Sequence, residues 1–177
     1  MNARLTPFFL SLGVFILDRI TKHIIRSGVP FWENITVIPG FFYIVHAENR
    51  GAAFGFLSES ASPLRTAFLI VLSAAVMIFI ATLLWSPARV GLVENWLSRC
   101  GLAFVLGGAA GNLYDRIFRG AVTDFLEFYF GSYVFPAFNV ADTAISIGAG
   151  LLLLEMWRTR GQHKTEPSPA DSGRGEA

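Results

Sequence analysis

The sequence predicts an all-α membrane protein, a bundle of four transmembrane helices with a small β-platform and a surface helix or lid. The first observation is composition: of 177 residues, 53% are hydrophobic and only 15% are charged, and the mean hydropathy is +0.51. A soluble domain is rarely so apolar. The second is the presence of four runs that approach the roughly 20 apolar residues needed to cross a bilayer core. They lie at about 6–25, 67–85, 97–113 and 138–157.

The first run, 6–25, contains Asp18, Arg19 and Lys22. Arg4 followed by an apolar stretch is also how a secretory signal begins. However, the run continues through its charges without a small-x-small cleavage pattern. We therefore expect an uncleaved first helix.

The longest connection, about 26–66, separates the first two runs and predicts a small cap. Segments 35–38 and 41–46 are rich in β-branched and aromatic residues, and Pro39-Gly40 separates them. This pattern is typical of a short hairpin. The cap is therefore expected to contain the β-platform.

The remaining segments differ in polarity. Run 67–85 has no charged or strongly polar residue, whereas 97–113 ends near small residues at 107–111 that suit close helix packing. The small residues are not a phosphate loop, because the Gly-Lys-Ser/Thr ending is missing.

Segment 122–136 is too short and interrupted to cross the membrane and should lie along its surface. Residues 161–177 have the composition of a disordered tail.

Several functional classes are excluded by composition. The formal net charge is +1 and no basic stripe interleaves with aromatic residues, so no nucleic-acid partner is expected. Cys100 is the only cysteine and has no histidine placed to activate it, so it is interpreted as a packing residue. The three histidines lack metal-ligand spacing, and we expect neither a metal nor a cofactor.

The charge distribution gives only a mild preference for orientation. Arg158, Arg160 and Lys164 follow the last run and favour cytoplasmic termini. Other arginines, including Arg26 and Arg119, would then lie outside. From the residues alone, the orientation stays open.

Two acidic residues beside apolar runs are candidates for chemistry. Asp124 follows the third run and Asp142 opens the fourth, so chain direction places both near the same membrane face. A charge at the bilayer centre costs at least ~2.5–3.5 kcal/mol, and such residues are usually functional. Two carboxyls about 3 Å apart would share a proton and offer one acid and one base for peptide hydrolysis. The pattern equally allows both residues to be helix caps.

Five motifs occur in an order that resembles the lipoprotein signal peptidase family, also called signal peptidase II. The resemblance covers nearly all of the chain before the tail. The motifs are Asp18-Arg19-Ile20-Thr21-Lys22, Asn49-Arg50-Gly51-Ala52-Ala53-Phe54, Gly107-Gly108-Ala109-Ala110-Gly111-Asn112-Leu113-Tyr114-Asp115-Arg116, Val122-Thr123-Asp124-Phe125 and Phe138-Asn139-Val140-Ala141-Asp142.

The resemblance implies an aspartyl endopeptidase of the bacterial cytoplasmic membrane with Asp124 and Asp142 as its catalytic dyad. Its termini would be cytoplasmic, and its cap and active site would lie near the outer face. The implied substrates are diacylglyceryl-modified prolipoproteins, cut N-terminal to the lipidated cysteine. Membrane lipid is the other expected partner, and the chain is expected to be a monomer.

The resemblance and side-chain chemistry together also imply substrate-binding or supporting residues. Asn112, Arg116 and Asn139 would line the site with amide and guanidinium donors. Asn49 and Gly51 would belong to the outer cap. Asp18 and Lys22, four residues apart on one helical face, are expected to form a structural ion pair. The motif also includes Gly108 and Asp115.

Two other classes of protein are kept as alternatives. A proton-coupled transporter would use the acidic residues as a relay, but no internal repeat is found. A non-enzymatic membrane scaffold would tolerate the isosteric loss of one carboxylate. The aromatic segment 125–130 is expected to act as a movable lid, an interface anchor, or both.

Overall fold

The computed structural model describes residues 5–31, 33–51, 63–85 and 95–162. Within them the chain forms helices and a single antiparallel sheet. The elements are α1 (Thr6–Gly28), β1 (Asn34–Ile38), β2 (Phe42–Asn49), α2 (Pro63–Trp85), α3 (Trp96–Arg119), β3 (Val122–Phe130), β4 (Tyr133–Phe138) and α4 (Val140–Gln162). The predicted disordered tail falls largely on residues 163–177, which lie outside the described residues, as does part of the predicted cap, 52–62.

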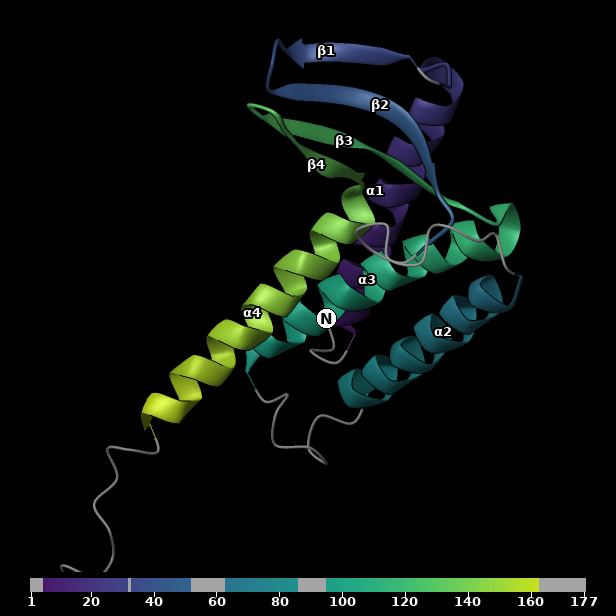
Figure 1. Cartoon of the computed structure of the whole chain (residues 1–177). Helices are drawn as coiled ribbons and strands as arrows, with labels where there is room; N and C mark the ends of the chain where they lie inside the picture. The colour runs from purple at the N-terminus through teal and green to yellow at the C-terminus, as the bar shows by residue number, and fades with distance from the viewer. Residues whose placement is uncertain (1–4, 32, 52–62, 86–94, 163–177) are drawn as a thin grey trace, which may run out of the picture.

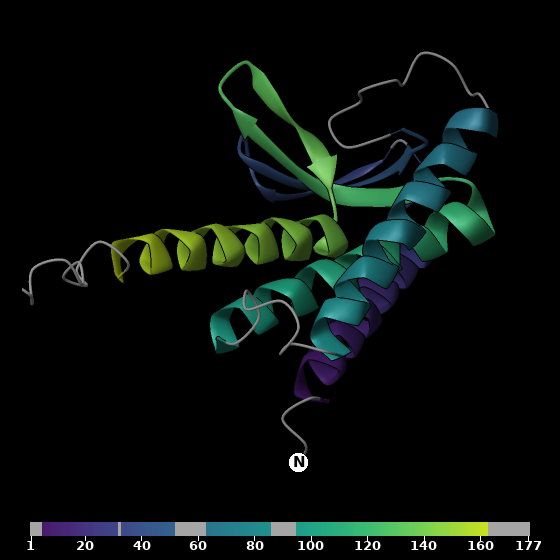
Figure 2. The same cartoon turned by 90° about the horizontal axis from the view of Figure 1, so that it is seen from below.

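Helix α3 is the centre of the bundle, because it packs against each of the other three helices (Figures 1 and 2). It extends six residues beyond the predicted run and ends at Gly120, whose φ is 74° and whose N–H donates to the Arg116 carbonyl over 3.2 Å. A glycine in this left-handed conformation is a common way to end a helix. The extra residues carry the polar side chains Asp115 and Arg116 into the site, next to Asn112 at the end of the predicted run.

The sheet has the order β1-β2-β3-β4, and all neighbours are antiparallel. It joins two hairpins that are far apart in sequence, since α2 and α3 lie between β2 and β3. Figure 1 shows it at the end of the bundle where α1 stops and α4 starts. A cluster of Ile25, Val29 and Phe125 seals the end of α1 against β3. The predicted β-platform is confirmed and is larger than expected.

The prediction of a surface helix in 122–136 is wrong. This segment forms β3 and β4, joined by a two-residue loop in which Gly131 has a φ of 65°. Alternating aromatic and β-branched residues favour a strand, and glycine in such a loop favours a hairpin. The edge of β2 also supplies a partner for β3. The alternative that Asp124 caps a surface helix is therefore wrong as well.

The molecule carries its polar side chains inside and much of its apolar surface outside. Four polar residues are 0% exposed: Asp18, Lys22, Asp115 and Asn139. Large apolar side chains that are more than half exposed lie on every helix, among them Phe9, Phe68, Phe118 and Trp157. This is the reverse of a soluble protein and suits a lipid surrounding. By length and composition, segments Thr66–Trp85 and Val140–Thr159 are long and apolar enough to cross a membrane.

The small residues of α3 allow close helix contacts, as predicted. A Cβ on Gly108 would collide with the Ala141 carbonyl oxygen of α4, and one on Gly107 would come within 2.8 Å of the Val14 Cβ of α1. A Cβ on Gly111 would collide with the Asp18 carboxylate. These glycines bring α1 and α4 against the face of α3 that carries the site.

We predict that Gly108→Ala destabilises the protein by about 1–3 kcal/mol, because the added methyl group has no space at this crossing. Thermal unfolding in detergent measures the effect. Gly150→Ala on α4 is the matched control, because a Cβ there meets nothing within 4 Å. Equal unfolding temperatures for the two variants would contradict the role assigned to Gly108.

Candidate active site

The two candidate catalytic carboxylates lie near the start of the β3-β4 hairpin and just after its end. Asp124 lies on β3, is 3% exposed and pairs in register with Ala47 of β2. Asp142 lies in the first turn of α4. The Asn139 side-chain oxygen accepts the Asp142 backbone N–H over 3.0 Å, as a helix cap does. The capping role considered for Asp142 therefore belongs to Asn139.

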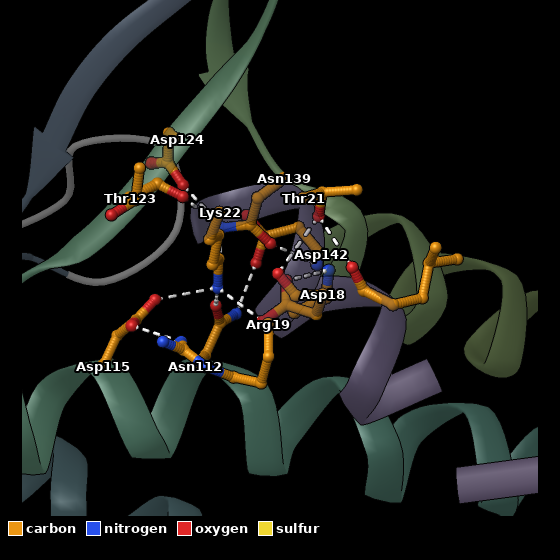
Figure 3. A network of polar contacts seen from close by, with 12 residues as sticks. Asp18, Arg19, Thr21, Lys22, Asn112, Asp115, Thr123, Asp124, Asn139 and Asp142 are labelled. Carbon is orange, nitrogen blue, oxygen red and sulfur yellow. Dashed lines mark hydrogen bonds and ion pairs between the residues drawn. The ribbon is translucent and has the colours of Figure 1, made fainter. Parts of the chain in front are cut away.

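Two asparagine amides connect the carboxylates (Figure 3). Asn139 Nδ2 donates to Asp124 Oδ1 over 2.6 Å, and Asn112 Nδ2 donates to Asp142 Oδ1 over 2.7 Å. Asn139 Nδ2 also lies 3.4 Å from Asn112 Oδ1. The predicted proximity of Asp124 and Asp142 is thus realised by a continuous chain of side-chain contacts.

The neighbours of each amide fix its orientation. Lys22 Nζ donates to Asn112 Oδ1 over 3.0 Å, and an ammonium group can only donate. The oxygen of Asn112 must therefore face Lys22, which turns its NH₂ group toward Asp142. In Asn139, the oxygen faces the Asp142 backbone N–H, which turns its NH₂ group toward Asp124.

Burial and, to a smaller extent, the nearby negative charge of Asp142 raise the pKa of Asp124 to about 7. Hydrogen bonds from Asn49 and Asn139 oppose this by stabilising the ionised form. Asp124 can therefore exchange a proton near neutral pH. A pair of carboxyls that holds one proton provides an acid and a base at the same place.

Lys22 is the centre of a buried charged cluster beneath the amides. Its Nζ lies 2.9 Å from Asp18 Oδ2 and 3.0 Å from Asp115 Oδ2. The predicted Asp18–Lys22 ion pair is confirmed, and Asp115 extends it to α3. Asp18 Oδ1 also accepts the Ala141 backbone N–H over 3.0 Å, which ties α1 to the start of α4.

The cap contributes through the end of β2. Asn49 Nδ2 donates to Asp124 Oδ2 over 3.0 Å, while Asn49 Oδ1 accepts the Gly51 N–H over 2.9 Å. Arg116 reaches the Gly51 carbonyl oxygen over 3.4 Å and interacts electrostatically with both Asp142 and Asp124. Ten of the eleven predicted site residues therefore belong to one polar network. The eleventh, Gly108, supports it by helix packing.

A cavity of about 460 Å³ adjoins the network. Asp142, Asn112, Arg116 and Asn49 supply its polar side. Most of its wall is apolar and comes from α2, α3, α4 and β4: Leu69, Leu72, Val76, Val105, Ala109, Phe135, Pro136, Phe138 and Ile145. Its lining suits a ligand with an apolar portion beside a polar group.

Four residues of the network were not assigned to the site from the sequence: Arg19, Arg26, Arg119 and Thr123. Arg19 pairs with Asp115 and lies 4.1 Å from the Tyr114 ring centre, and Arg26 Nη1 donates to Thr123 Oγ1 over 3.0 Å. The Thr123 carbonyl oxygen accepts from Asn139. The sequence could have indicated Arg19 and Arg26, because they lie three residues before and four residues after Lys22 and so share its helical face. Within the described residues, no group of three or more potential metal ligands is found.

Solved structures first place the chain in a class. It is similar to a bacterial membrane enzyme structure determined by the in meso method at 2.3 Å resolution, with a TM-score of 0.77 and 26% identity over 92% of this chain and 94% of that one. A second bacterial membrane enzyme, at 1.9 Å resolution, gives a TM-score of 0.71 and 27% identity over 85% and 92%. The chain is a bacterial membrane protein.

Sequence comparison then gives the family. The family model for signal peptidase (SPase) II matches residues 10–158. The lipoprotein signal peptidase of Solibacter usitatus is 48% identical over 84% of this chain and 88% of that protein. That of Maridesulfovibrio salexigens is 41% identical over 90% and 100%. The chain belongs to the signal peptidase II family and is a peptidase, which disfavours the transporter and scaffold alternatives.

Proposed function

We propose that this protein is an aspartyl endopeptidase that removes the signal peptide from diacylglyceryl-modified prolipoproteins. It would cut on the N-terminal side of the lipidated cysteine. The observation that carries the aspartyl mechanism is the pair of carboxylates, Asp124 and Asp142, joined through the amides of Asn139 and Asn112. Family membership supports the substrate class.

In the proposed reaction, the ionised member of the dyad takes a proton from a water molecule as its oxygen attacks the scissile carbonyl carbon. The protonated member donates a hydrogen bond to the carbonyl oxygen, where negative charge develops. Collapse of the tetrahedral intermediate then breaks the C–N bond, and the leaving nitrogen takes up a proton from the dyad. No metal is needed to polarise the carbonyl.

The surrounding donors would hold the reactants in place. Asn112 and Asn139 fix the two carboxylates, while Arg116 and Asn49 face the cavity and can bind carbonyl groups of an extended peptide. The apolar wall from α2 and α4 suits the diacylglyceryl chains or the apolar signal peptide. Gly51 would let the cap approach the substrate closely.

We further propose that all four helices cross the membrane and form one domain over residues 1–160. Helices α1 and α3 have 23 and 24 residues and so measure about 35 Å, enough for a bilayer core. Both termini would be cytoplasmic, with the sheet and dyad near the outer face. The exposed Phe130 and Tyr133 at the tip of the β3-β4 hairpin would anchor it at the interface. The chain would act as a monomer.

A cleavage assay tests the substrate. The purified protein in detergent is incubated with a diacylglyceryl-modified prolipoprotein and, separately, with the same precursor lacking the lipid. We expect cleavage of the lipidated precursor only, with the new N-terminus at the modified cysteine. Equal cleavage of both precursors would contradict the proposed specificity. A folded protein that cleaves neither, beside an active relative as positive control, would contradict the function.

We predict that kcat/KM for this cleavage decreases as the pH rises above about 7. The proton shared by the dyad is present below the Asp124 pKa of about 7 and is lost above it. Initial rates at low substrate concentration between about pH 5 and pH 9 measure the profile. Enzyme returned from high to neutral pH controls for unfolding and should recover its activity. A profile that stays flat up to about pH 9 would contradict the shared proton.

A further inference from the structure

Three arginines gather around Asp115 Oδ1, the oxygen of this carboxylate that does not pair with Lys22. Arg19 is ion-paired with Asp115 Oδ1, and the same oxygen lies 3.7 Å from Arg26 Nη1 and 3.8 Å from Arg119 Nε. We call Arg19, Arg26 and Arg119 the arginine cluster. Three guanidinium groups thus share a single carboxylate oxygen.

Among the residues that the structure describes, the acidic side chains near the arginine cluster do not balance its charge. Asp115 uses its other oxygen for Lys22, which also pairs with Asp18. Two carboxylates therefore face four cations. Strand β3 contributes no charge here, because its contact with Arg26 is the uncharged hydroxyl of Thr123. Glu48 lies opposite Thr123 on β2, but it pairs with Arg50. Excess positive charge in a partly buried place needs an anion.

The surroundings of the arginine cluster are apolar and exposed. Arg26 and Arg119 lie in the last turns of α1 and α3, and Arg19 covers the Tyr114 ring. The Tyr114 ring packs at a tilt of 40° against Phe118, which is 68% exposed. The Arg119 side chain is itself 45% exposed, so its guanidinium group is accessible from this surface.

We propose that the arginine cluster binds the phosphate of an anionic phospholipid, whose acyl chains lie along Tyr114 and Phe118. Guanidinium groups form paired hydrogen bonds with phosphate oxygens, and basic pockets between membrane helices select anionic headgroups. Charge complementarity identifies the occupant: the cluster has a surplus of cations at the ends of two helices, the level at which lipid phosphates lie. The inference rests on the proposed membrane crossing of α1 and α3, and is independent of the peptidase reaction.

Native mass spectrometry of the full chain tests the site. The protein is released from detergent with equal amounts of phosphatidylglycerol and phosphatidylcholine, and the bound lipid is quantified. We expect the wild type to prefer phosphatidylglycerol and Arg119→Gln to reduce that preference about five- to tenfold. Within the described part of the chain, Arg119 makes a single long ion pair, so this variant should fold. Arg119→Lys keeps the positive charge but loses the planar guanidinium group, so its preference for phosphatidylglycerol should lie between those of the wild type and Arg119→Gln.

Arg158→Gln is the matched control, because it removes the same charge from an exposed position near the other end of α4. It should bind phosphatidylglycerol as the wild type does. The proposal is overturned if Arg119→Gln keeps the wild-type preference, if the wild type has none, or if Arg158→Gln loses as much. This experiment measures lipid binding and not cleavage. A negative result would therefore not contradict the proposed peptidase function, and a negative cleavage assay would not contradict the lipid site.

Discussion

Replacing Asp142 by Asn is expected to lower kcat for prolipoprotein cleavage by about 10²–10⁴-fold or more while the protein stays folded. An amide has nearly the same shape as a carboxyl group but can neither accept the proton of water nor give one to the carbonyl oxygen. Asp124→Asn should have an effect of the same size. Because the two carboxyls act as a unit, the double variant should be little worse than either single variant.

Single-turnover cleavage, with unfolding temperatures recorded in parallel, measures this effect. Glu127→Gln is the matched control: it makes the same change from carboxylate to amide on β3, where Glu127 accepts a hydrogen bond from Tyr129 and does not contact the dyad. It should retain near-normal turnover. A folded Asp142→Asn protein with near-normal kcat would exclude this residue from the chemistry.

Lys22→Met is expected to have the largest effect on stability, a loss of about 3–5 kcal/mol. The ammonium group is fully buried between Asp18 and Asp115, and its removal leaves both carboxylates without their shared cation. The oxygen of Asn112 also loses its closer donor, at 3.0 Å, and keeps only the 3.4 Å contact from Asn139 among the described residues. The amide can then rotate, and Asp142 loses a fixed hydrogen bond. Turnover should therefore fall in the fraction that remains folded.

Thermal unfolding should show a decrease of about 10 °C for Lys22→Met. The double variant Lys22→Met/Asp18→Asn should recover part of the loss, because it removes one uncompensated charge while the side-chain oxygen can still accept the Ala141 N–H. Arg50→Met breaks an ion pair whose side chains are 65% and 42% exposed, and should cost less than about 1 kcal/mol. If Lys22→Met were as stable as Arg50→Met, the buried cluster would not hold the site together.

Local patterns in the sequence predicted local structure well. The first hairpin follows from β-branched runs around Pro39-Gly40, and the Asp18–Lys22 pair follows from spacing along one helix. Segment 122–136 was misassigned because its strands are stabilised by β2, about 80 residues earlier in the chain. A strand whose partner is distant carries little local signal beyond its composition.

The sequence predicted which residues belong to the candidate site but not which of them contact one another. Chain direction placed Asp124 and Asp142 at the same end of the bundle, and the family motifs supplied the residues around them. The contacts of Lys22 with Asn112 and Asp115 depend on how α1 lies against α3, which spacing along either helix does not determine. The arginine cluster was not predicted for the same reason, since Arg19 and Arg26 lie on α1 whereas the carboxylate that they share with Arg119 belongs to α3.

The long-range contacts of the candidate site also determine when, during synthesis of the chain, the proposed activity can begin. Asn49 meets Asp124 across 75 residues, and Asp18 meets the Ala141 N–H across 123. Contacts of such long range form late in folding. A nascent chain that contains only α1, α2 and α3 lacks both Asp142 and Asn139, whose side chain caps the start of α4. On the proposed mechanism, hydrolysis can therefore begin only after the ribosome has delivered the last helix, and incomplete chains would be harmless to other membrane proteins.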